Sequence, residues 1–300
     1  MANSQHQPES FTGTYMPILS QATSASTSLQ FDYQIKTLLQ QGSGKFNEDA
    51  LLVEDNLFGV FDGASSLKGD LYLGKSGAWW AAHLACAAFS TNDTDLASLA
   101  DKANALIARG MTLAGVNQDD RLQLWSTSAA VVRVAEDKIE FSQVGDALIL
   151  WIDTDGRFHL PVPFHNHDQA TFERWAELER KGTKDIRSAL TTQIEQVRLQ
   201  RNRDYGVLNG EDQMRQFLRT GVLATSRIKH LLLFTDGMHL SNSRRDLVDF
   251  SSMVELFLRT DLDGLHRAVR RRETDDPNCC KFPRFKRHDD IAAISLEFQD

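Results

Sequence analysis

The stretch GKFNEDALLVEDNLFGVFDGASS, residues Gly44–Ser66, sets two short apolar runs beside three acids. The second run, Leu57–Phe61, is typical of a buried strand, and it ends on Asp62 followed by Gly63. A carboxylate at the edge of an apolar sheet loses hydration, and neighbouring carboxylates repel it. An Asp-Gly pair is also a common turn dipeptide, so this pair alone favours a simple turn.

The same combination of a strand end and an acid recurs along the chain. It appears at Thr235-Asp236-Gly237, at Gly145-Asp146 and at Asp289-Asp290-Ile291. Hard divalent cations such as Mg²⁺ and Mn²⁺ select oxygen ligands and relieve the repulsion between carboxylates. A glycine after the aspartate lets the backbone turn sharply, so that its carbonyl can also reach a metal. The repeated pattern therefore favours a divalent metal site over isolated turns.

The composition limits the class of protein. The chain has 300 residues, of which 41% are hydrophobic and 25% charged, with a net charge of −8. A sizeable core is possible, and a general nucleic-acid or anionic-membrane surface is not expected. Three cysteines, two of them adjacent, form no disulfide framework, which predicts a reducing, cytoplasmic location. No apolar run approaches the ~20 residues that span a bilayer.

The chain divides into a flexible leader over residues 1–28 and a single domain over residues 29–300. We expect strands at 29–36, 50–53, 57–61, 128–135, 138–143, 147–152, 230–234 and 290–298. We expect helices at 75–89, 96–113, 168–200 and 211–220, and two more within 244–273. Strands and helices are segregated rather than alternating, which predicts antiparallel sheets covered by antiparallel helices.

Five motifs together carry a resemblance to a known family. They are NED (Asn47–Asp49), FGVFDGASS (Phe58–Ser66), QVGDALILWI (Gln143–Ile152), LLLFTDGM (Leu231–Met238) and HDDIAAISL (His288–Leu296). In this order, over about residues 30–298, the chain resembles the metal-dependent protein phosphatases of type 2C in their bacterial form. The resemblance implies an α+β fold, a four-layer α/β/β/α sandwich of two antiparallel β-sheets flanked by antiparallel helix pairs. It also implies a signalling enzyme that hydrolyses phosphoserine and phosphothreonine in proteins.

The resemblance assigns metal-binding roles to particular residues. Two Mn²⁺ or Mg²⁺ ions are implied, with a third possible. Asp62 bridges the two ions, and the Gly63 carbonyl joins one of them. The other implied ligands are Asp236 and Asp289 for the first ion, Glu48 for the second and Asp146 for the third.

The implied chemistry needs no protein nucleophile. Asp49 orients metal-bound water, and a hydroxide that bridges the two ions attacks phosphorus in line. The catalytic residues are thus expected to be Asp62 and Asp49, joined by a cation that holds the substrate phosphate. That cation departs from the family pattern, because Gly44 stands where an arginine is usual. We hypothesise that Lys45 replaces it, against an ordinary solvated lysine.

Other departures leave alternatives open. Leu240 occupies a position where many members carry a third-metal aspartate, so a third ion is doubtful; the neighbouring His239 is either a general acid or ligand, or a surface histidine. We interpret His165–Asp168 as a solvated loop and Tyr205–Gly210 as a border of the cleft. A basic cluster is either a solvated face or a guide for acidic substrates: Arg270, Arg271, Arg272, Lys281, Arg284, Lys286 and Arg287.

Two other functions compete with the phosphoprotein phosphatase. One is a catalytically silent module that keeps the fold and binds a phosphorylated partner, which the missing arginine favours. The other is a phosphatase of a small phosphorylated metabolite. The retained acids favour an enzyme over the silent module. We expect a phosphorylated protein as substrate, no nucleic-acid or membrane partner, and a monomer.

Overall fold

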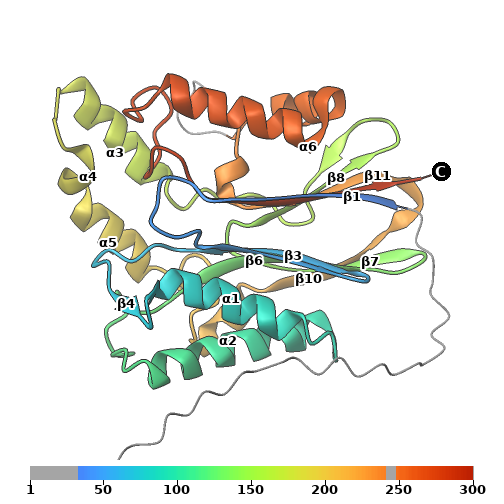
Figure 1. Ribbon diagram of the computed structural model, residues 1–300, viewed down its shortest axis with the longest axis horizontal. Helices are drawn as coiled ribbons and strands as arrows, with labels where there is room; N and C mark the ends of the chain where they lie inside the picture. The colour runs from blue at the N-terminus through green and yellow to red at the C-terminus, as the bar shows by residue number, and fades with distance from the viewer. Residues whose placement is uncertain (1–32, 241–247, 300) are drawn as a thin grey trace, which may run out of the picture. The chain divides into compact units, whose positions relative to one another are not determined.

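Two five-stranded antiparallel sheets lie at the centre of the protein (Figure 1). The computed structural model describes residues 33–240 and 248–299. The first sheet consists, in order, of β1 (Tyr33–Gln40), β12 (Ile291–Phe298), β11 (Ile228–Phe234), β8 (Leu148–Asp153) and β9 (Phe158–His159). The second consists of β10 (Arg219–Ala224), β7 (Lys138–Val144), β6 (Thr127–Val134), β3 (Leu57–Gly63) and β2 (Asp49–Glu54). A short hairpin of β4 (Leu71–Tyr72) and β5 (Lys75–Ser76) precedes the first helix.

The central strands are apolar on both faces because each sheet is covered on both sides. In β11, Leu231 and Leu233 belong to the core between the two sheets. The alternate residues Leu232 and Phe234 belong to the core under the covering helix. This arrangement explains why such strands have continuous apolar runs rather than alternating patterns.

Helices cover the outer face of each sheet. The helices α1 (Gly77–Phe89) and α2 (Leu96–Leu113) lie against the second sheet, where the alanines of α1 allow a close approach. The helix α6 (Phe250–Asp275) covers the first sheet and is interrupted at Asp261, whose φ is 61°. The two helices predicted within 244–273 are therefore the two parts of one interrupted element.

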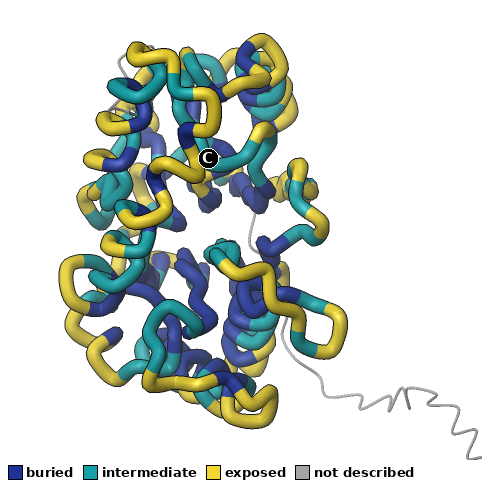
Figure 2. The backbone as a smooth tube through the Cα atoms, turned by 90° about the vertical axis from the view of Figure 1, so that its left-hand side faces the viewer, coloured by how far each residue is buried: buried dark blue, intermediate teal, exposed yellow. Residues whose placement is uncertain are grey.

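Three further helices stand at one end of the sandwich (Figure 1). They are α3 (Gln169–Arg180), α4 (Ile186–Ala189) and α5 (Thr191–Leu199). A small core of their own holds them to the segment after α6, through Trp175, Ile186, Leu190, Ile194 and Cys279. Seen from this end, exposed turns surround buried backbone of both sheets (Figure 2).

The predicted α/β/β/α sandwich of two antiparallel sheets is confirmed. The helix predicted over 211–220 is wrong: a short 3₁₀ helix at Asp212–Gln216 leads into the edge strand β10, which pairs with β7. Val222 is 60% exposed, so this strand lacks the apolar pattern that would identify it. The predicted leader lies outside the described residues, and the division into domains stays a prediction. No helix in the described ranges is long and apolar enough to cross a membrane.

Candidate metal and phosphate site

Six acids meet at one end of the sandwich because of the antiparallel order. The strand β2 begins and β3 ends there in the second sheet, whereas β8 begins, β11 ends and β12 begins there in the first. We call these acids the acidic centre: Glu48, Asp49, Asp62, Asp146, Asp236 and Asp289. Each belongs to one of these five strand ends. The structure therefore brings together every acid that the sequence predicted as a metal or catalytic residue.

Asp62 and Asp236 occupy the middle of the acidic centre. Asp62 lies opposite Asp49 in the pairing of β2 with β3. Burial raises the pKa of the Asp62 carboxyl well above its usual range, and Asp236 and its acidic neighbours raise it further. The surrounding protein atoms, followed by the charge of Asp289, likewise raise the pKa of Asp236, whose exposed side chain lines the cleft. Such carboxyls need a proton or a cation to offset their repulsion.

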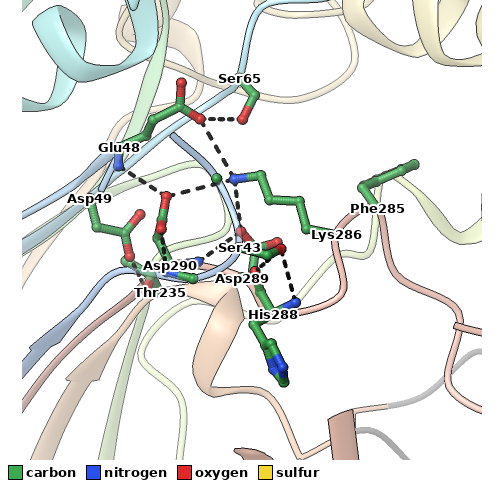
Figure 3. A network of polar contacts seen from close by, with 12 residues as sticks. Ser43, Glu48, Asp49, Ser65, Thr235, Phe285, Lys286, His288, Asp289 and Asp290 are labelled. Carbon is green, nitrogen blue, oxygen red and sulfur yellow. Dashed lines mark hydrogen bonds and ion pairs between the residues drawn. The ribbon is translucent and has the colours of Figure 1, made fainter. Parts of the chain in front are cut away.

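Asp49 is buried and faces the first sheet. Its Oδ2 accepts a hydrogen bond of 2.7 Å from Thr235 Oγ1, at the end of β11 (Figure 3). The same hydroxyl oxygen accepts a 3.0 Å hydrogen bond from the backbone N–H of Ala292 in β12. Burial raises the pKa of Asp49 well above its usual range, although the Thr235 hydrogen bond opposes the shift. The Thr235 hydroxyl thus orients Asp49 and links the two sheets.

Two hydroxyl groups hold Glu48 in place. Ser76 Oγ donates a 2.7 Å hydrogen bond to Glu48 Oε1, and Ser65 Oγ donates to Glu48 Oε2. Ser76 is also the N-cap of α1, since its Oγ accepts the backbone N–H of Trp79 at 3.1 Å. One hydroxyl therefore starts a helix and positions a predicted metal ligand. Neither serine was among the predicted site residues.

Two glycines allow backbone segments to approach each other closely. A Cβ on Gly63 would lie 2.5 Å from the carbonyl oxygen of Ala78 and 2.6 Å from that of Glu48. A Cβ on Gly237 would lie 1.9 Å from the carbonyl oxygen of Asp290. Side chains cannot be accommodated at these distances. The glycine of each Asp-Gly pair is thus required by packing, whether or not the Gly63 carbonyl binds a metal.

Asp290 holds the loop that carries Glu48. Its side chain is 2% exposed, and its two oxygens accept backbone N–H groups of Gly42, at 2.7 Å, and Glu48, at 3.0 Å. The sequence identified the Asp289-Asp290 pair but assigned a role only to Asp289. The second acid orients backbone instead of facing the cleft.

A lysine lies among the acids of the centre. Lys286 Nζ is 2.9 Å from Asp289 Oδ1, 3.6 Å from Glu48 Oε2 and 3.7 Å from Asp290 Oδ2 (Figure 3). Burial alone would lower the pKa of Lys286, but Asp289 and Asp290 outweigh it and the pKa is raised. The sequence placed Lys286 in a basic cluster without singling it out, because nothing in that run distinguishes a buried lysine from a solvated one.

Arginines of the α5 region line the cleft together with Asp62 and Asp236. They are Arg187, Arg198 and Arg201, and Tyr205 beside them confirms that its loop borders the cleft. Among the ion pairs of the described residues, none involves Arg198 or Arg201. Burial, followed by the charge of Arg201, lowers the pKa of Arg198 to about 10. Lys45, by contrast, is exposed, with its Nζ 5.2 Å from the centre of the Phe46 ring.

The loop before α3 also enters the cleft. His167 stacks on Tyr205 with ring centres 4.0 Å apart, and its Nε2 lies 3.7 Å from Asp146 Oδ2. Burial raises the pKa of the Asp168 carboxyl. The interpretation of a solvated loop is therefore right for His165, which is exposed, and wrong for His167 and Asp168. Pro161 and Pro163 indicated an irregular backbone, but they could not indicate that the following residues turn into the cleft.

His239 is enclosed by aromatic rings. Phe164, Phe234 and Phe250 meet its ring edge to face at 5.5, 5.9 and 6.3 Å. Its Nε2 is buried without a hydrogen-bond partner among the described residues. Burial lowers its pKa to about 4, so the ring is neutral at pH 7 and poorly suited to donate a proton. The surface-histidine interpretation is wrong, and the general-acid role is disfavoured. Leu240 beside it belongs to the core.

The donor set of the acidic centre fits hard divalent cations. All its donors are carboxylate oxygens, and three of them have a raised pKa because burial and mutual repulsion disfavour their charge. Within residues 33–240 and 248–299, however, no three acids, histidines or cysteines already converge as the ligands of one ion. Lys286 Nζ lies 3.6 Å from Glu48 Oε2 and 2.9 Å from Asp289 Oδ1.

An antiparallel four-layer sandwich with an acidic cleft at one end is the architecture of the metal-dependent protein phosphatases. The sequence model of protein phosphatase 2C matches residues 40–268, and the chain belongs to this family. It is therefore a serine/threonine protein phosphatase by family, and the family depends on Mn²⁺ or Mg²⁺. Members of the family act on phosphorylated proteins. Among the curated proteins, no match is found.

Solved structures of bacterial phosphatases share the fold. The Mycobacterium tuberculosis serine/threonine phosphatase PstP/Ppp is 14% identical with a TM-score of 0.55, covering 90% of this chain and 100% of that chain. The catalytic domain of PstP in complex with two manganese ions is 15% identical with a TM-score of 0.54, covering 90% and 100%. Stp1 from Staphylococcus aureus is 15% identical with a TM-score of 0.56, covering 96% and 99%.

Proposed function

We propose that the chain hydrolyses phosphoserine and phosphothreonine in proteins at the acidic centre, with Mn²⁺ or Mg²⁺ as cofactor. One observation carries this proposal: Asp62, Asp146, Asp236 and Asp289, from four strand ends of both sheets, line one cleft, and Glu48 and Asp49 lie beside them. A protein that only binds a partner has no need to gather so many carboxyls at one place. A monomeric, cytoplasmic enzyme remains our prediction.

Particular residues would hold the metal. Asp62, Asp236 and Asp146 border the cleft together and are the proposed ligands on its open side. Asp289 and Glu48 complete the proposed set on the side of Lys286. A divalent ion bound there would supply Lewis acidity, which lowers the pKa of water and neutralises charge on the phosphoryl group. Asp49 would orient the attacking water, because it lies opposite Asp62 in the pairing of β2 with β3 and the Thr235 hydroxyl fixes its carboxyl.

The substrate phosphate would bind to Arg198. Its guanidinium borders the same cleft as Asp62 and makes no direct ion pair among the described residues, although the charge of Asp168 acts on it. A partly buried arginine that makes no direct ion pair is stabilised when an anion binds to it. Arginine also provides the two-pronged geometry that phosphate accepts, which a lysine lacks. Gly44 stands where the family usually has a phosphate-binding arginine. Arg198 therefore has stronger support than Lys45 as the residue that takes over this role.

The first experiment tests hydrolysis and its dependence on metal. Wild type and Asp62→Asn are assayed with a phosphothreonine peptide and with p-nitrophenyl phosphate, in Mn²⁺, Mg²⁺ or EDTA. We expect hydrolysis only with metal, a preference for the peptide, and loss of activity in the variant. A folded wild type that hydrolyses neither substrate under any condition would overturn the proposal. Hydrolysis of the small ester alone would point to a small phosphorylated substrate.

A second experiment identifies the phosphate-binding cation. A charged hydrogen bond contributes about 1.5–3 kcal/mol, so Arg198→Ala should raise the KM for the peptide about 10- to 100-fold. Lys45→Ala and the exposed Arg203→Ala, as matched control, should change it less than about twofold. An Arg198 variant that behaves like the Arg203 variant would remove this assignment.

A further inference from the structure

Lys286 is surrounded by acids that come from different parts of the chain. Glu48 precedes β2, whereas Asp289 and Asp290 precede β12. The lysine side chain is 18% exposed, so water screens its charge little. Its ammonium points from the loop into the space between these carboxylates (Figure 3). A solvated surface lysine would show neither this burial nor three partners.

The backbone on the N-terminal side of Lys286 is held firmly. Asp276 accepts the backbone N–H groups of Cys280, Lys281 and Phe282 at 2.9, 3.1 and 2.8 Å. Arg284 Nη1 donates to the same carboxylate at 3.0 Å. These bonds fold the segment between α6 and β12 into a fixed turn that presents Lys286.

The backbone and the side chain beside Lys286 are held as well. The Phe285 ring packs on Phe172 of α3, with ring centres 5.0 Å apart. On the C-terminal side, the N–H of Ser43 donates to the carbonyl oxygen of His288 at 2.8 Å. The position of the ammonium is therefore set by packing and hydrogen bonds on both sides, and is built into the fold.

The ammonium group of Lys286 lies where a metal ion bound to Glu48 and Asp289 would have to lie. Glu48 and Asp289, two of its three partners, are among the proposed metal ligands. An ammonium 2.9 Å from Asp289 Oδ1 already neutralises that carboxylate. A divalent ion on the same oxygens would lie within a few ångströms of the ammonium, and the two positive charges would repel each other strongly.

We infer that Lys286 is an internal cation that takes one of the metal positions of the acidic centre, the one beside Glu48 and Asp289. The protein then binds one divalent ion fewer than its acids could hold. The remaining ion binds on the side of Asp62, Asp146 and Asp236, where no lysine or arginine makes an ion pair with these acids among the described residues. This inference rests on the proposed function only in assuming that the acids bind metal.

The test counts Mn²⁺ ions directly. Full-length wild type, Lys286→Met and Lys281→Met are titrated with MnCl₂ by calorimetry, and bound metal is measured after equilibrium dialysis. Methionine matches the length of lysine without its charge, and the exposed Lys281 on the same turn is the matched control. We expect Lys286→Met to bind one more equivalent than wild type, and Lys281→Met to bind as wild type does. Adding Glu48→Gln to Lys286→Met should weaken the gained site at least tenfold.

Thermal unfolding with and without MnCl₂ provides a readout that does not depend on activity. Without metal, Lys286→Met leaves three carboxylates uncompensated, so we expect a lower Tm than for wild type and a larger rise on adding Mn²⁺. Lys286→Arg keeps the charge and should resemble wild type in both measurements. If Lys286→Met folds only when Mn²⁺ is present, that result also supports the inference, because Mn²⁺ then supplies the positive charge that the lysine supplied.

Two results would overturn the inference. One is an equal number of Mn²⁺ ions, bound with equal affinity, in wild type and Lys286→Met. The other is an unchanged metal count with a raised KM for the phosphopeptide, which would make Lys286 a substrate-binding residue. Failure of the proposed function looks different: wild type would lack metal-dependent hydrolysis, whereas the difference in Mn²⁺ count between the variants would remain measurable.

Discussion

The double role of Ser76 leads to a quantitative prediction. In Ser76→Ala the first turn of α1 loses its cap, which costs about 1 kcal/mol. Glu48 also loses a 2.7 Å hydrogen bond to a charged acceptor, which contributes about 1.5–3 kcal/mol. The free energy of unfolding should therefore fall by about 2.5–4 kcal/mol. In the Lys286→Met background the same change should weaken the gained Mn²⁺ site, because Glu48 then keeps only the hydrogen bond from Ser65.

A second N-cap in the same protein separates the two effects. Asp95 caps α2 by accepting the backbone N–H of Ser98 at 3.0 Å, and it lies far along the chain from the acids. Asp95→Ala should cost about 1 kcal/mol and leave Mn²⁺ affinity unchanged. Urea unfolding in EDTA gives the stabilities, and calorimetry gives the affinities.

A double-mutant cycle of Ser76→Ala with Glu48→Gln then isolates the bond between the two side chains. We expect a coupling free energy above about 1 kcal/mol. The reasoning fails if Ser76→Ala and Asp95→Ala destabilise equally and neither changes metal affinity, since the serine would then act only as a cap.

Three further predictions concern packing and pH. Gly237→Ala should prevent folding or cost more than about 3 kcal/mol, because its Cβ would meet the Asp290 carbonyl at 1.9 Å; circular dichroism and urea unfolding test this. The pKa of His239 is about 4 in the folded chain and about 6.5 when unfolded, so the unfolded chain binds the proton more tightly. His239 should therefore cost wild type up to about 3 kcal/mol relative to His239→Phe as the pH drops from 6.5 to 4; an equal pH dependence of urea unfolding in the two proteins would contradict this. The carboxyls of Asp49, Asp62 and Asp236 have raised pKa values, so in EDTA the folded chain keeps protons that the unfolded chain loses above about pH 4. Its stability should decline as the pH rises from there, and saturating Mn²⁺ should flatten the decline; equal slopes with and without metal would refute the link.

The sequence predicted the sheets and the acids for the same physical reason. A strand buried on both faces needs a continuous apolar run, and an acid at its end interrupts that run visibly, as Asp62 does after Phe61. The edge strand β10 was missed because its exposed side leaves no such run. Thr235 orients the Asp49 carboxyl, and Asp290 orients the backbone of Glu48. Both roles depend on the register between strands that are distant in sequence, so no local pattern predicts them.

The cations of the cleft could not be predicted from local pattern. Lys286 lies in a basic run, and only the turn held by Asp276 directs it inward while Arg287 remains exposed. Arg198 lies on a helix with no strong apolar face, and its place in the cleft depends on how α5 packs against the end of the sandwich. Such contacts are long-range, so no spacing along the chain encodes them. Lys45, chosen because it follows Gly44 at the usual arginine position, is exposed in the structure, and its role stays a prediction.

The helices at the end of the sandwich have their own small core, separate from the cores of the two sheets. The acids lie on the sheets, whereas Arg198 and Arg201 lie on and beside α5. Under the proposed function, the metal ligands and the phosphate-binding arginine therefore come from different parts of the polypeptide. We expect that exchanging the segment from α3 to α5 between relatives would change how the substrate phosphate is held while the proposed metal ligands on the sheets stay in place.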